Sequence, residues 1–566
     1  MEKRVFLAIL LSFVVLAVYQ AVFPPARPVP VVLAPDSSQA APVVTTPVVG
    51  AAAITAASVP QVAPLVGDAL ARDIVVETET VRAVFTTAGA TLKSWQLKNY
   101  FDNGGPLELL PADVPADQPR SFAVSTNDAA LSQTLATALY RPSADQLTLG
   151  SSAGQLTFEY RDQSGLNARK TFYFQPEGKA YLLKVEAAVD EGGVSRPVTV
   201  SSGAAIGTGH EDGGFYHVSV RAVQQLAGDV DHHAAKDLAE QARFEGDLRF
   251  AGVDNQYFLF AALPGSERIA VNYRPISLPV TGVAEVTTRG LIAFDISVPG
   301  SLALTYFLGP KDVDTLRSID PQLVRAIDFG FFAPIVVPLL IALKWMHGFI
   351  GNWGWSIVAL TLTINIIIFP LRHRSMVSMK KMQALQPEVK AIQERYAKYK
   401  VTDPERQKMN QEMMGLYKQK GVNPVAGCVP MLLTMPVLFA FYSMLSAAIE
   451  LRDAPFFGWI TDLSRADPWF ITPVLMGVSM LWQQRMMPTT ADPIQQKVFL
   501  LMPVIFTVSF LWAPSGLVVY WFVSNMLAIG QQYLTNRMIA APVAVTGRSA
   551  AARRVKSGRS GGSGQS

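Results

Sequence analysis

Apolar and polar residues follow three different patterns along this chain of 566 residues. Between residues 72 and 310, apolar side chains alternate with polar ones, as in Val81-Ala83-Phe85 and Leu302-Leu304-Tyr306-Leu308. This period of two is typical of strands with one buried face. Residues 375–421 carry apolar side chains three and four positions apart, which indicates amphipathic helices. Long uncharged apolar runs fill much of the remainder, so the sequence predicts a β region followed by apolar helices.

The apolar run at residues 353–371 is the clearest predicted membrane span. Its nineteen residues contain no charged side chain, and at ~1.5 Å per residue they can just cross the hydrocarbon core of a bilayer. Asn365 is the one amide within it, and Arg372, His373 and Arg374 follow directly. Because positively charged flanks stay in the cytoplasm, this end of the span is predicted to be cytoplasmic.

Five further apolar runs raise the prediction to six spans. The first, residues 5–23, follows Lys3 and Arg4 and precedes Pro24-Pro25 in place of a small-residue cleavage site. It is interpreted as an uncleaved signal anchor, with a cleaved signal peptide as the alternative. Positive charges at Arg485, at Arg537 and in the tail predict that both termini are cytoplasmic and that the β region is periplasmic. The other four runs lie at residues 422–449, 469–487, 498–512 and 517–534.

The patterns divide the chain into six parts. Trp345 and Lys344 suit the headgroup level of a membrane, so their segment is interpreted as interfacial, with a full span as the alternative. Turn formers such as Gly192-Gly193 divide the β region into antiparallel strands of a large sandwich. The parts are a signal anchor (1–23), an extended Pro/Ala-rich linker (24–67), a β-sandwich domain (68–315), an interfacial amphipathic helix region (316–351), a helical core (352–537) and a basic tail (538–566).

Composition supports a membrane protein with a sizeable soluble part. Charged residues make up 16% of the chain, apolar residues 50%, and the mean hydropathy is +0.25, whereas soluble proteins carry about 25% charged residues. The apolar runs contain no Asp or Glu, and the chain has no G-x-x-x-x-G-K-[ST] motif. A proton-coupled transporter and a nucleotide-hydrolysing enzyme are therefore disfavoured. The single cysteine, Cys428, excludes an intrachain disulfide.

Residues 375–420 predict a cytoplasmic hairpin of two helices. Asp403-Pro404-Glu405 is a favourable start for the second helix, and Pro387 is predicted to kink the first. From Arg372 to Lys420 there are twelve Lys or Arg against five Asp or Glu, a net charge of +7. The hairpin is predicted to be mobile and to dock a partner.

Histidines and acidic residues of the β domain could form a metal site or a sugar-processing site. His210-Glu211-Asp212, His217 and His232-His233 lie within a Gly-rich stretch. Their spacing matches no metal-ligand motif. They are interpreted as solvated loop residues, and the domain is predicted to be catalytically silent.

Several short sequence words resemble the YidC/Oxa/Alb family of membrane protein insertases, in its Gram-negative form. The resemblance is dense over residues 320–537. The words are Gly351-Asn352-Trp353-Gly354, Gly421-Val422-Asn423-Pro424, Gly427-Cys428-Val429-Pro430, Met435-Pro436, Pro488-Thr489-Thr490, Met502-Pro503 and Pro514-Ser515-Gly516-Leu517.

The resemblance implies a polytopic α-helical protein of the cell inner membrane, with six spans, a five-helix insertase core and a periplasmic β-supersandwich. It implies an insertase and chaperone for integral membrane proteins, which is not an enzyme and needs no cofactor, metal, small-molecule substrate or nucleotide hydrolysis. Nascent membrane proteins would enter a hydrophilic groove open to cytoplasm and lipid, alone or with the Sec translocon. Ribosome contacts would fall on residues 375–420, residues 488–496 and the basic tail.

The resemblance also assigns residues to this groove. Thr361, Asn365 and Ser509 are expected to face it. Its rim is expected to contain Pro430, Met435, Pro436, Trp512, Tyr520 and Trp521. The family carries an arginine where this chain has Asn365, so the groove is expected to be weaker in positive potential, with Arg372, Arg374 and Arg485 supplying charge at its mouth.

Overall fold

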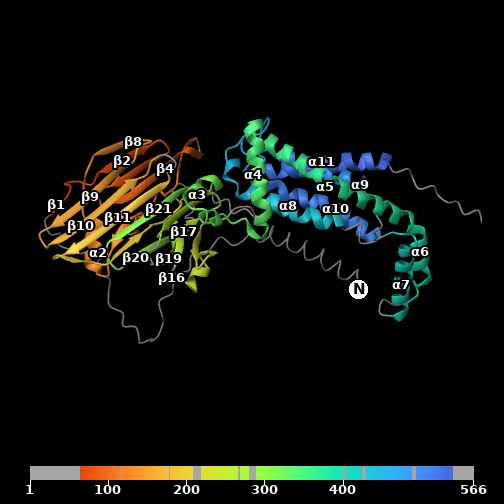
Figure 1. Ribbon diagram of the computed structural model, residues 1–566, viewed down its shortest axis with the longest axis horizontal. Coiled ribbons are helices and arrows are strands. Elements are labelled where there is room, and N and C mark those ends of the chain that lie inside the picture. The colour runs from red at the N-terminus through yellow and green to blue at the C-terminus, as the bar shows by residue number, and fades with distance from the viewer. Residues whose placement is uncertain are drawn as a thin grey trace, which may run out of the picture. The chain divides into compact units, whose positions relative to one another are not determined.

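The computed structural model describes residues 64–102, 104–115, 118–176, 179–207, 218–265, 268–279, 288–399, 403–422, 429–486 and 493–538. The predicted signal anchor, most of the linker, the stretch from His210 to His217 and nearly all of the basic tail lie outside these residues. The chain divides into two compact units (Figure 1). The first contains residues up to Gly354 together with residues 439–468 and 512–517, and the second contains the other helical residues.

The first unit contains three β-sheets, of which the largest has eleven strands. Its strand order is β1-β9-β10-β11-β21-β18-β17-β14-β15, with β7 on β9 and β12 on β11. The strands are β1 (Pro64–Val66), β7 (Arg141–Pro142), β9 (Gly154–Asp162), β10 (Leu166–Phe174), β11 (Leu182–Glu191), β12 (Val194–Ser195), β14 (Arg221–Leu226), β15 (Asp229–His233), β17 (Leu248–Asp254), β18 (Phe258–Leu263) and β21 (Leu302–Pro310).

Two five-stranded sheets complete the β domain. One has the order β16-β19-β20-β13-β6, and the other has the order β5-β4-β3-β2-β8. The strands are β16 (Arg243–Gly246), β19 (Ile269–Pro279), β20 (Thr288–Val298), β13 (Val198–Ser201), β6 (Ala123–Ser125), β5 (Gly105–Glu108), β4 (Thr91–Asp102), β3 (Val81–Thr86), β2 (Asp73–Thr78) and β8 (Gln146–Gly150).

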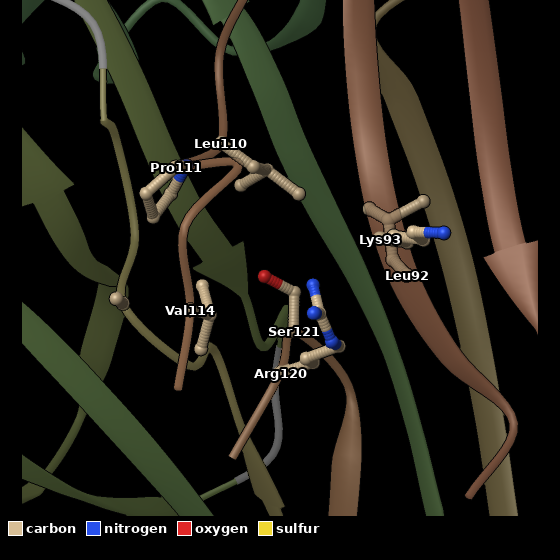
Figure 2. Close-up of a pocket in the computed structure, with 8 residues that line it drawn as sticks. Leu92, Lys93, Leu110, Pro111, Val114, Arg120 and Ser121 are labelled. Atoms are coloured by element: carbon tan, nitrogen blue, oxygen red, sulfur yellow. The ribbon is translucent and has the colours of Figure 1, made fainter. Parts of the chain in front are cut away.

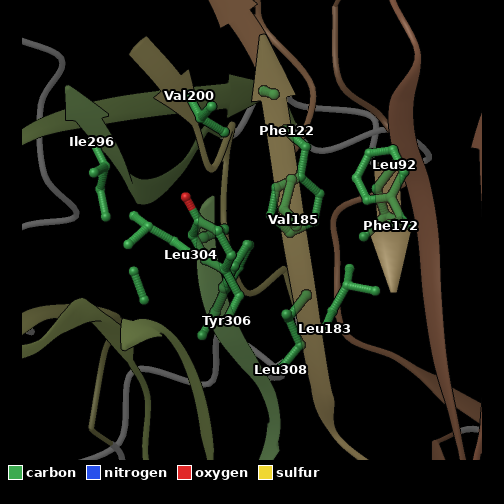
Figure 3. Packing of buried hydrophobic residues seen from close by; sticks show 14 of the residues in the cluster. Leu92, Phe122, Phe172, Leu183, Val185, Val200, Ile296, Leu304, Tyr306 and Leu308 are labelled. Carbon is green, nitrogen blue, oxygen red and sulfur yellow. The ribbon is translucent and has the colours of Figure 1, made fainter. Parts of the chain in front are cut away.

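One hydrophobic core joins the three sheets. Strand β21 buries the four alternating residues of its predicted pattern. Each is at most 2% exposed: Leu302, Leu304, Tyr306 and Leu308. Figure 3 shows Leu304, Tyr306 and Leu308 beside side chains from all three sheets. Each sheet therefore buries an apolar face in a shared core, as the period-two pattern predicts. Labelled neighbours are Phe172, Leu183 and Val185 of the large sheet, Val200 and Ile296 of the second sheet and Leu92 of the third.

Three details of the β domain differ from the prediction. β1 precedes the boundary predicted at residue 68, and its Pro64 pairs with Asp162 of β9. β2 pairs with β8 in parallel, within an otherwise antiparallel domain. A helix, α2 (Ala129–Thr137), was not predicted. Its signals were present, because Asp128 caps its N-terminus and Leu131 and Leu135 form a buried i, i+4 pair.

The structure also corrects the prediction for His232 and His233. Both lie in strand β15 and are half-buried, so they are not solvated loop residues. The ring of His233 stacks on Phe244. After β15 the chain forms one short 3-10 turn, Asp237–Ala239.

A buried lysine donates hydrogen bonds to three backbone carbonyls of the β domain. Lys170 is 2% exposed, and its ammonium group donates to the carbonyls of Gly89, Ala90 and Phe122 at 2.7, 3.2 and 2.8 Å. All three of these residues have positive φ angles. Burial lowers the pKa of Lys170 to about 7. The ammonium group of Lys170 therefore gives these three backbone carbonyls a hydrogen-bond donor.

A buried ionic network lies where the chain leaves the β domain. Asp254 is completely buried, and its Oδ2 lies 2.8 Å from Lys311 Nζ, 3.2 Å from Arg221 Nη2 and 3.6 Å from His232 Nε2. Arg221 also reaches Asp328 at 3.1 Å. The network therefore ties β14, β15 and β17 to the segment that follows β21.

That segment leads through α3 (Val313–Ile319) and two 3-10 turns (Leu323–Ala326 and Gly330–Phe332) to α4 (Ala333–Ile350). One face of α4 is buried through Val336, Leu340 and Leu343. Another face exposes Ile341, Trp345 and Phe349, which recur every four residues. Helix α4 therefore has one apolar face buried in the protein and a second apolar face left exposed.

Lys344 attaches α4 to two other parts of this unit. Its Nζ lies 2.8 Å from Asp312, 2.6 Å from Asp314 and 2.7 Å from Glu450. Asp312 and Asp314 stand at the start of α3, and Glu450 lies in the 3-10 turn Ile449–Leu451 after α8 (Val429–Ala447). Burial raises the pKa of Glu450, which eases the crowding of three carboxylates around one ammonium group.

Residues 448–468 pack on the β domain, which the sequence did not predict. Ile449 is 3% exposed and belongs to the β-domain core. Gln256 Nε2 donates to the carbonyl of Ser446 at 2.7 Å, and Arg452 donates to the carbonyl of Phe101 at 3.1 Å. These contacts join residues that are far apart in sequence, so no local pattern reports them.

Two of the sequence words that carry the family resemblance hold this loop in place. Gly351 ends α4 with a φ of 71°, and Asn352 Nδ2 donates to the carbonyls of Pro455 and Phe456. A side chain at Gly354 would lie 2.0 Å from the ring of Phe456. In the second word, Ser515 N donates to Arg465 O at 2.7 Å, and Gly516 N donates to Leu463 O at 2.9 Å.

The helical part of the chain continues with seven further helices among the described residues. Two helical segments there are long and apolar enough to cross a membrane by length and composition: Gly330–Ile350, which contains α4, and Trp353–Ala384. The second is a predicted span, whereas the first was predicted to be interfacial. The helices are α5 (Trp353–Ala384), α6 (Gln386–Arg395), α7 (Pro404–Gln419), α8 (Val429–Ala447), α9 (Ile471–Met486), α10 (Pro493–Ser509) and α11 (Ser515–Met538), and a 3-10 turn, Phe510–Trp512, follows α10.

Polar contacts within the second unit join α11 to its neighbours. Asn525 Nδ2 donates to Ser479 Oγ of α9 at 3.0 Å, and both residues are buried. Gln532 Nε2 donates to Met486 O of α9 at 2.5 Å, and Gln531 Nε2 donates to Phe369 O of α5 at 3.3 Å. Asn525 is thus an interhelical hydrogen-bonding residue within an apolar helix.

Candidate functional site

Helix α5 carries the most unusual polar arrangement among the apolar helices. Asn365 lies in its apolar half and is half-buried. Its Nδ2 donates to the carbonyl of Thr361 at 2.8 Å, and its Oδ1 accepts from Arg372 Nη1 at 2.8 Å. A carbonyl can only accept and a guanidinium can only donate, so the two contacts fix the orientation of the amide. The side chain of Arg372 therefore extends back along α5 to the level of Asn365.

This geometry corrects the expectation for Arg372. The sequence placed its charge at the cytoplasmic end of α5, about 10 Å from Asn365. The hydrogen bond instead brings the guanidinium to Asn365 itself, and Arg372 is half-buried. Position 365 thus lacks a charged side chain of its own but has a cation in contact with it. Arg374 and Arg485 are exposed, and their place at the groove mouth stays a prediction.

The two other residues expected to face the groove differ from each other in exposure. Thr361 is completely buried, and its hydroxyl donates to Ile357 O within α5 at 2.7 Å. The expectation that Thr361 lines an accessible groove is therefore wrong for its side chain. Ser509 is exposed near the end of α10, where its hydroxyl donates to Ile505 O at 3.0 Å.

The residues expected at the rim also differ in how far they are exposed. Trp512 and Met435 are 61% and 38% exposed, so both offer apolar surface, and Pro436 is half-buried. Trp521 packs against Phe506 and Phe510 at ring distances of 5.5 and 4.9 Å. Tyr520 is only 5% exposed, which contradicts a rim position for it. The side chain of Pro430 lies outside the described residues.

The predicted hairpin is formed by α6 and α7. Lys420 pairs with Glu388 at 3.1 Å and Arg395 pairs with Glu412 at 2.8 Å, a register that requires antiparallel helices. Asp403 caps α7 through Glu405 N, with Pro404 in its first turn, as predicted. Pro387 begins α6 after α5 has ended, so it separates two helices where a kink was expected.

One small pocket lies in the β domain among the described residues. Its volume is about 10 Å³, which is the volume that one water molecule needs. Figure 2 shows Arg120 and Ser121 between Val114 and the pair Leu92 and Lys93. His210, Glu211, Asp212 and His217 lie outside the described residues.

Comparison with known proteins places the whole chain in one family. Family models described as "60Kd inner membrane protein" and "YidC periplasmic domain" match residues 345–542 and 73–342. A membrane protein insertase YidC from Geobacter metallireducens is 35% identical over 561 residues, which cover 96% of this chain and 99% of the relative. This chain belongs to the YidC family of membrane protein insertases. A second YidC, from Geobacter sulfurreducens, is 38% identical over 82% of this chain and 86% of its own length.

The family resemblance inferred from the sequence words is thereby confirmed, and with it the function of a membrane protein insertase. The chain is an inner-membrane protein with a large periplasmic β domain and a helical insertase region. Its relatives are named insertases, and none of those described above is named as an enzyme.

Solved structures give weaker likenesses. A crystal structure of an active YidC insertase is 18% identical, with a TM-score of 0.34, over 83% of this chain and 95% of its own. A galactose mutarotase related enzyme from Lactobacillus acidophilus is 10% identical, with a TM-score of 0.27, over 42% of this chain and 97% of its own.

Proposed function

We propose that this insertase moves the hydrophilic tails of its substrates through a polar groove that opens to cytoplasm and lipid. The chain crosses the membrane six times, with both termini in the cytoplasm, and α4 lies along the periplasmic interface. The groove is built on Asn365 of α5 and Ser509 of α10. Apolar substrate segments slide past Met435, Pro436 and Trp512 into the bilayer.

The observation that carries this proposal is the pair formed by Asn365 and Arg372. Helix α5 is apolar from Trp353 to Leu371, yet it holds a guanidinium against an amide within that part. A charged group at the centre of a bilayer costs about 2.5–3.5 kcal/mol or more. Water that reaches the pair would lower this energetic cost. A wet site at this depth shortens the apolar distance that a substrate tail must cross, and it does so without nucleotide hydrolysis.

The interfacial position of α4 is supported by Lys344. Three carboxylates of α3 and the loop after α8 lie within 2.8 Å of its ammonium group. These partners belong to the β domain and to a loop that packs on it. Were α4 to cross the bilayer, Lys344 and its three carboxylates would enter the hydrocarbon, which is unfavourable.

Partners are proposed from charge and exposure. Residues 386–420, which contain the α6–α7 hairpin, carry eight Lys or Arg against five Asp or Glu, and the end of α5 adds Arg372, Arg374, Lys380 and Lys381. The resulting net charge of +7 suits the phosphate backbone of ribosomal RNA. The basic tail adds five Lys or Arg and no acidic residue after Arg537. The loop at 488–496 has no Lys or Arg and is proposed as a ribosome contact from the family resemblance alone. Nascent membrane proteins are the substrates, and the Sec translocon is a proposed partner for those with long translocated segments.

Cysteine labelling tests the groove, because Cys428 is the only native cysteine and can be replaced by serine. Asn365→Cys and Ser509→Cys should react with a membrane-impermeant thiol reagent added to the cytoplasmic side of inverted vesicles. Ile367→Cys is the matched control, since Ile367 is 70% exposed but lies about 200° around α5 from Asn365. It should face lipid and stay unlabelled. Equal labelling at 365 and 367, or none at 365 and 509, would contradict the groove.

A further inference from the structure

Asn365 and Arg372 share one face of α5. Seven residues amount to almost two full turns, so both side chains point to the same side, with about 10 Å between their backbones. The two side chains can span this distance when that of Arg372 extends back along the helix and that of Asn365 extends toward it. The 2.8 Å hydrogen bond between Arg372 Nη1 and Asn365 Oδ1 closes the gap.

The amide of Asn365 is held in place before it meets the arginine. Its Nδ2 donates to Thr361 O at 2.8 Å, which directs Oδ1 toward Arg372. Leucine at this position would leave the guanidinium without its acceptor. A long basic side chain near the end of a span normally extends to water at the interface. Here the acceptor at 365 holds it inside.

The guanidinium keeps most of its capacity to bind an anion. It has five N–H donors, and Asn365 accepts one of them. Helix α5 contains no Asp or Glu that could neutralise it. Arg372 is half-buried, so its charge is neither fully solvated nor sealed off.

We propose that Arg372, held at depth by Asn365, is the group that attracts acidic translocated segments of substrates. The proposal rests on the groove described above and adds a substrate preference to it. Arg372 is the anion-binding residue, and Asn365 is a positioning residue that acts through it. The two residues together do what a single arginine at position 365 would do. An attraction between opposite charges at a few ångströms is strong where water is partly excluded, and weak at the fully hydrated cytoplasmic surface.

The test uses the purified full-length chain in liposomes and two single-span substrates. The substrates differ only in their translocated tails, one with two Asp residues and the other with two Asn residues. The readout is the ratio of protease-protected acidic substrate to protected neutral substrate. Arg372→Gln should lower this ratio about tenfold, which corresponds to about 1.4 kcal/mol. Asn365→Leu should lower it nearly as far, because the arginine remains but is released toward the cytoplasm.

Two further variants separate positioning from a general defect. Lys381→Gln removes the same charge nine residues further along α5, where the side chain is exposed, and should leave the ratio unchanged. The double variant Asn365→Arg with Arg372→Gln returns the charge to the groove and should restore the ratio. In the Asn365→Leu background, Arg372→Gln should have little additional effect, because the two residues act as one unit.

The outcomes distinguish this proposal from the one on which it rests. If both substrates are inserted and Arg372→Gln does not change the ratio of acidic to neutral substrate, the proposal for Arg372 is overturned. The proposed groove is not contradicted by that result. Failure of the double variant to restore the ratio would also overturn it, because charge at position 365 would then not be what matters. A wild-type chain that inserts neither substrate would overturn the proposed function, and this inference with it.

Discussion

Replacing Asp254 by Asn is expected to destabilise the β domain by about 3–5 kcal/mol. The carboxylate is completely buried and faces Lys311, Arg221 and His232. An amide has almost the same shape but no charge. Lys311, itself 4% exposed, would then keep a buried positive charge without a counter-ion. Removing one partner of a buried pair costs far more than the intact pair contributes.

The loss should appear as a lower melting temperature of the β domain in the detergent-solubilised full-length chain. For a domain of this size, 3–5 kcal/mol corresponds to a decrease of roughly 6–20 °C. Asp73→Asn is the matched control, because Asp73 pairs with Lys93 at 2.7 Å but both are more than 40% exposed. It should change the stability by less than about 1 kcal/mol. Equal melting of the two variants would show that the buried network contributes nothing.

The same variant should change the response to acid. Burial alone would raise the pKa of Asp254, but the charge of Lys311 and the contacts with His232 and Arg221 hold it well below its usual value. A carboxyl group with a lowered pKa in the folded state stabilises the protein fully above its ordinary pKa of 3.8. That contribution is lost as pH falls below about 4 toward the folded pKa. Asp254→Asn should therefore lose less stability than wild type between pH 5 and pH 2.

Replacing Lys344 by Met is expected to detach α4 locally, at a cost of about 2–4 kcal/mol. Asp312, Asp314 and Glu450 would be left close together with no cation between them. Lys344 and Glu450 are 23% and 11% exposed as side chains, so the effect should lie between those of surface and fully buried pairs. Methionine keeps the apolar stem of lysine, which isolates the contribution of the charge.

Hydrogen exchange of the full-length chain should locate this effect. Amides of α3 and of residues 449–451 should exchange about 30- to 1000-fold faster in Lys344→Met. The strands β10 and β11, far along the large sheet, should keep their protection. Lys344→Arg should behave like wild type, since it keeps the cation. Unchanged exchange in Lys344→Met would mean that packing of Val336, Leu340 and Leu343 alone holds α4.

The sequence predicts those parts of the fold that a local pattern encodes. The buried alternation in β21 and the capped start of α7 are examples, because each depends on residues within a few positions of one another. The parallel pairing of β2 with β8 and the packing of Ile449 into the β-domain core could not be predicted. Both join segments that are far apart in sequence, and neither leaves a periodic signal.

The candidate site was predicted only in part for a related reason. Family resemblance directed attention to Asn365, but it treated Arg372 as a residue of the groove mouth. The seven-residue spacing that places both on one helix face is visible in the sequence. What the spacing does not give is the rotamer of Arg372, which could equally extend toward water. The burial of Thr361 and Tyr520 likewise depends on packing between helices.

Reconstitution is the most direct test of the central claim, that this chain alone inserts membrane proteins through a polar groove. The purified full-length protein would be placed in liposomes with a small single-span substrate and no nucleotide. The account predicts a protease-protected substrate fragment, above the amount in protein-free liposomes, that is unchanged by added ATP. Protection no greater than in protein-free liposomes, or protection that requires ATP, would contradict it.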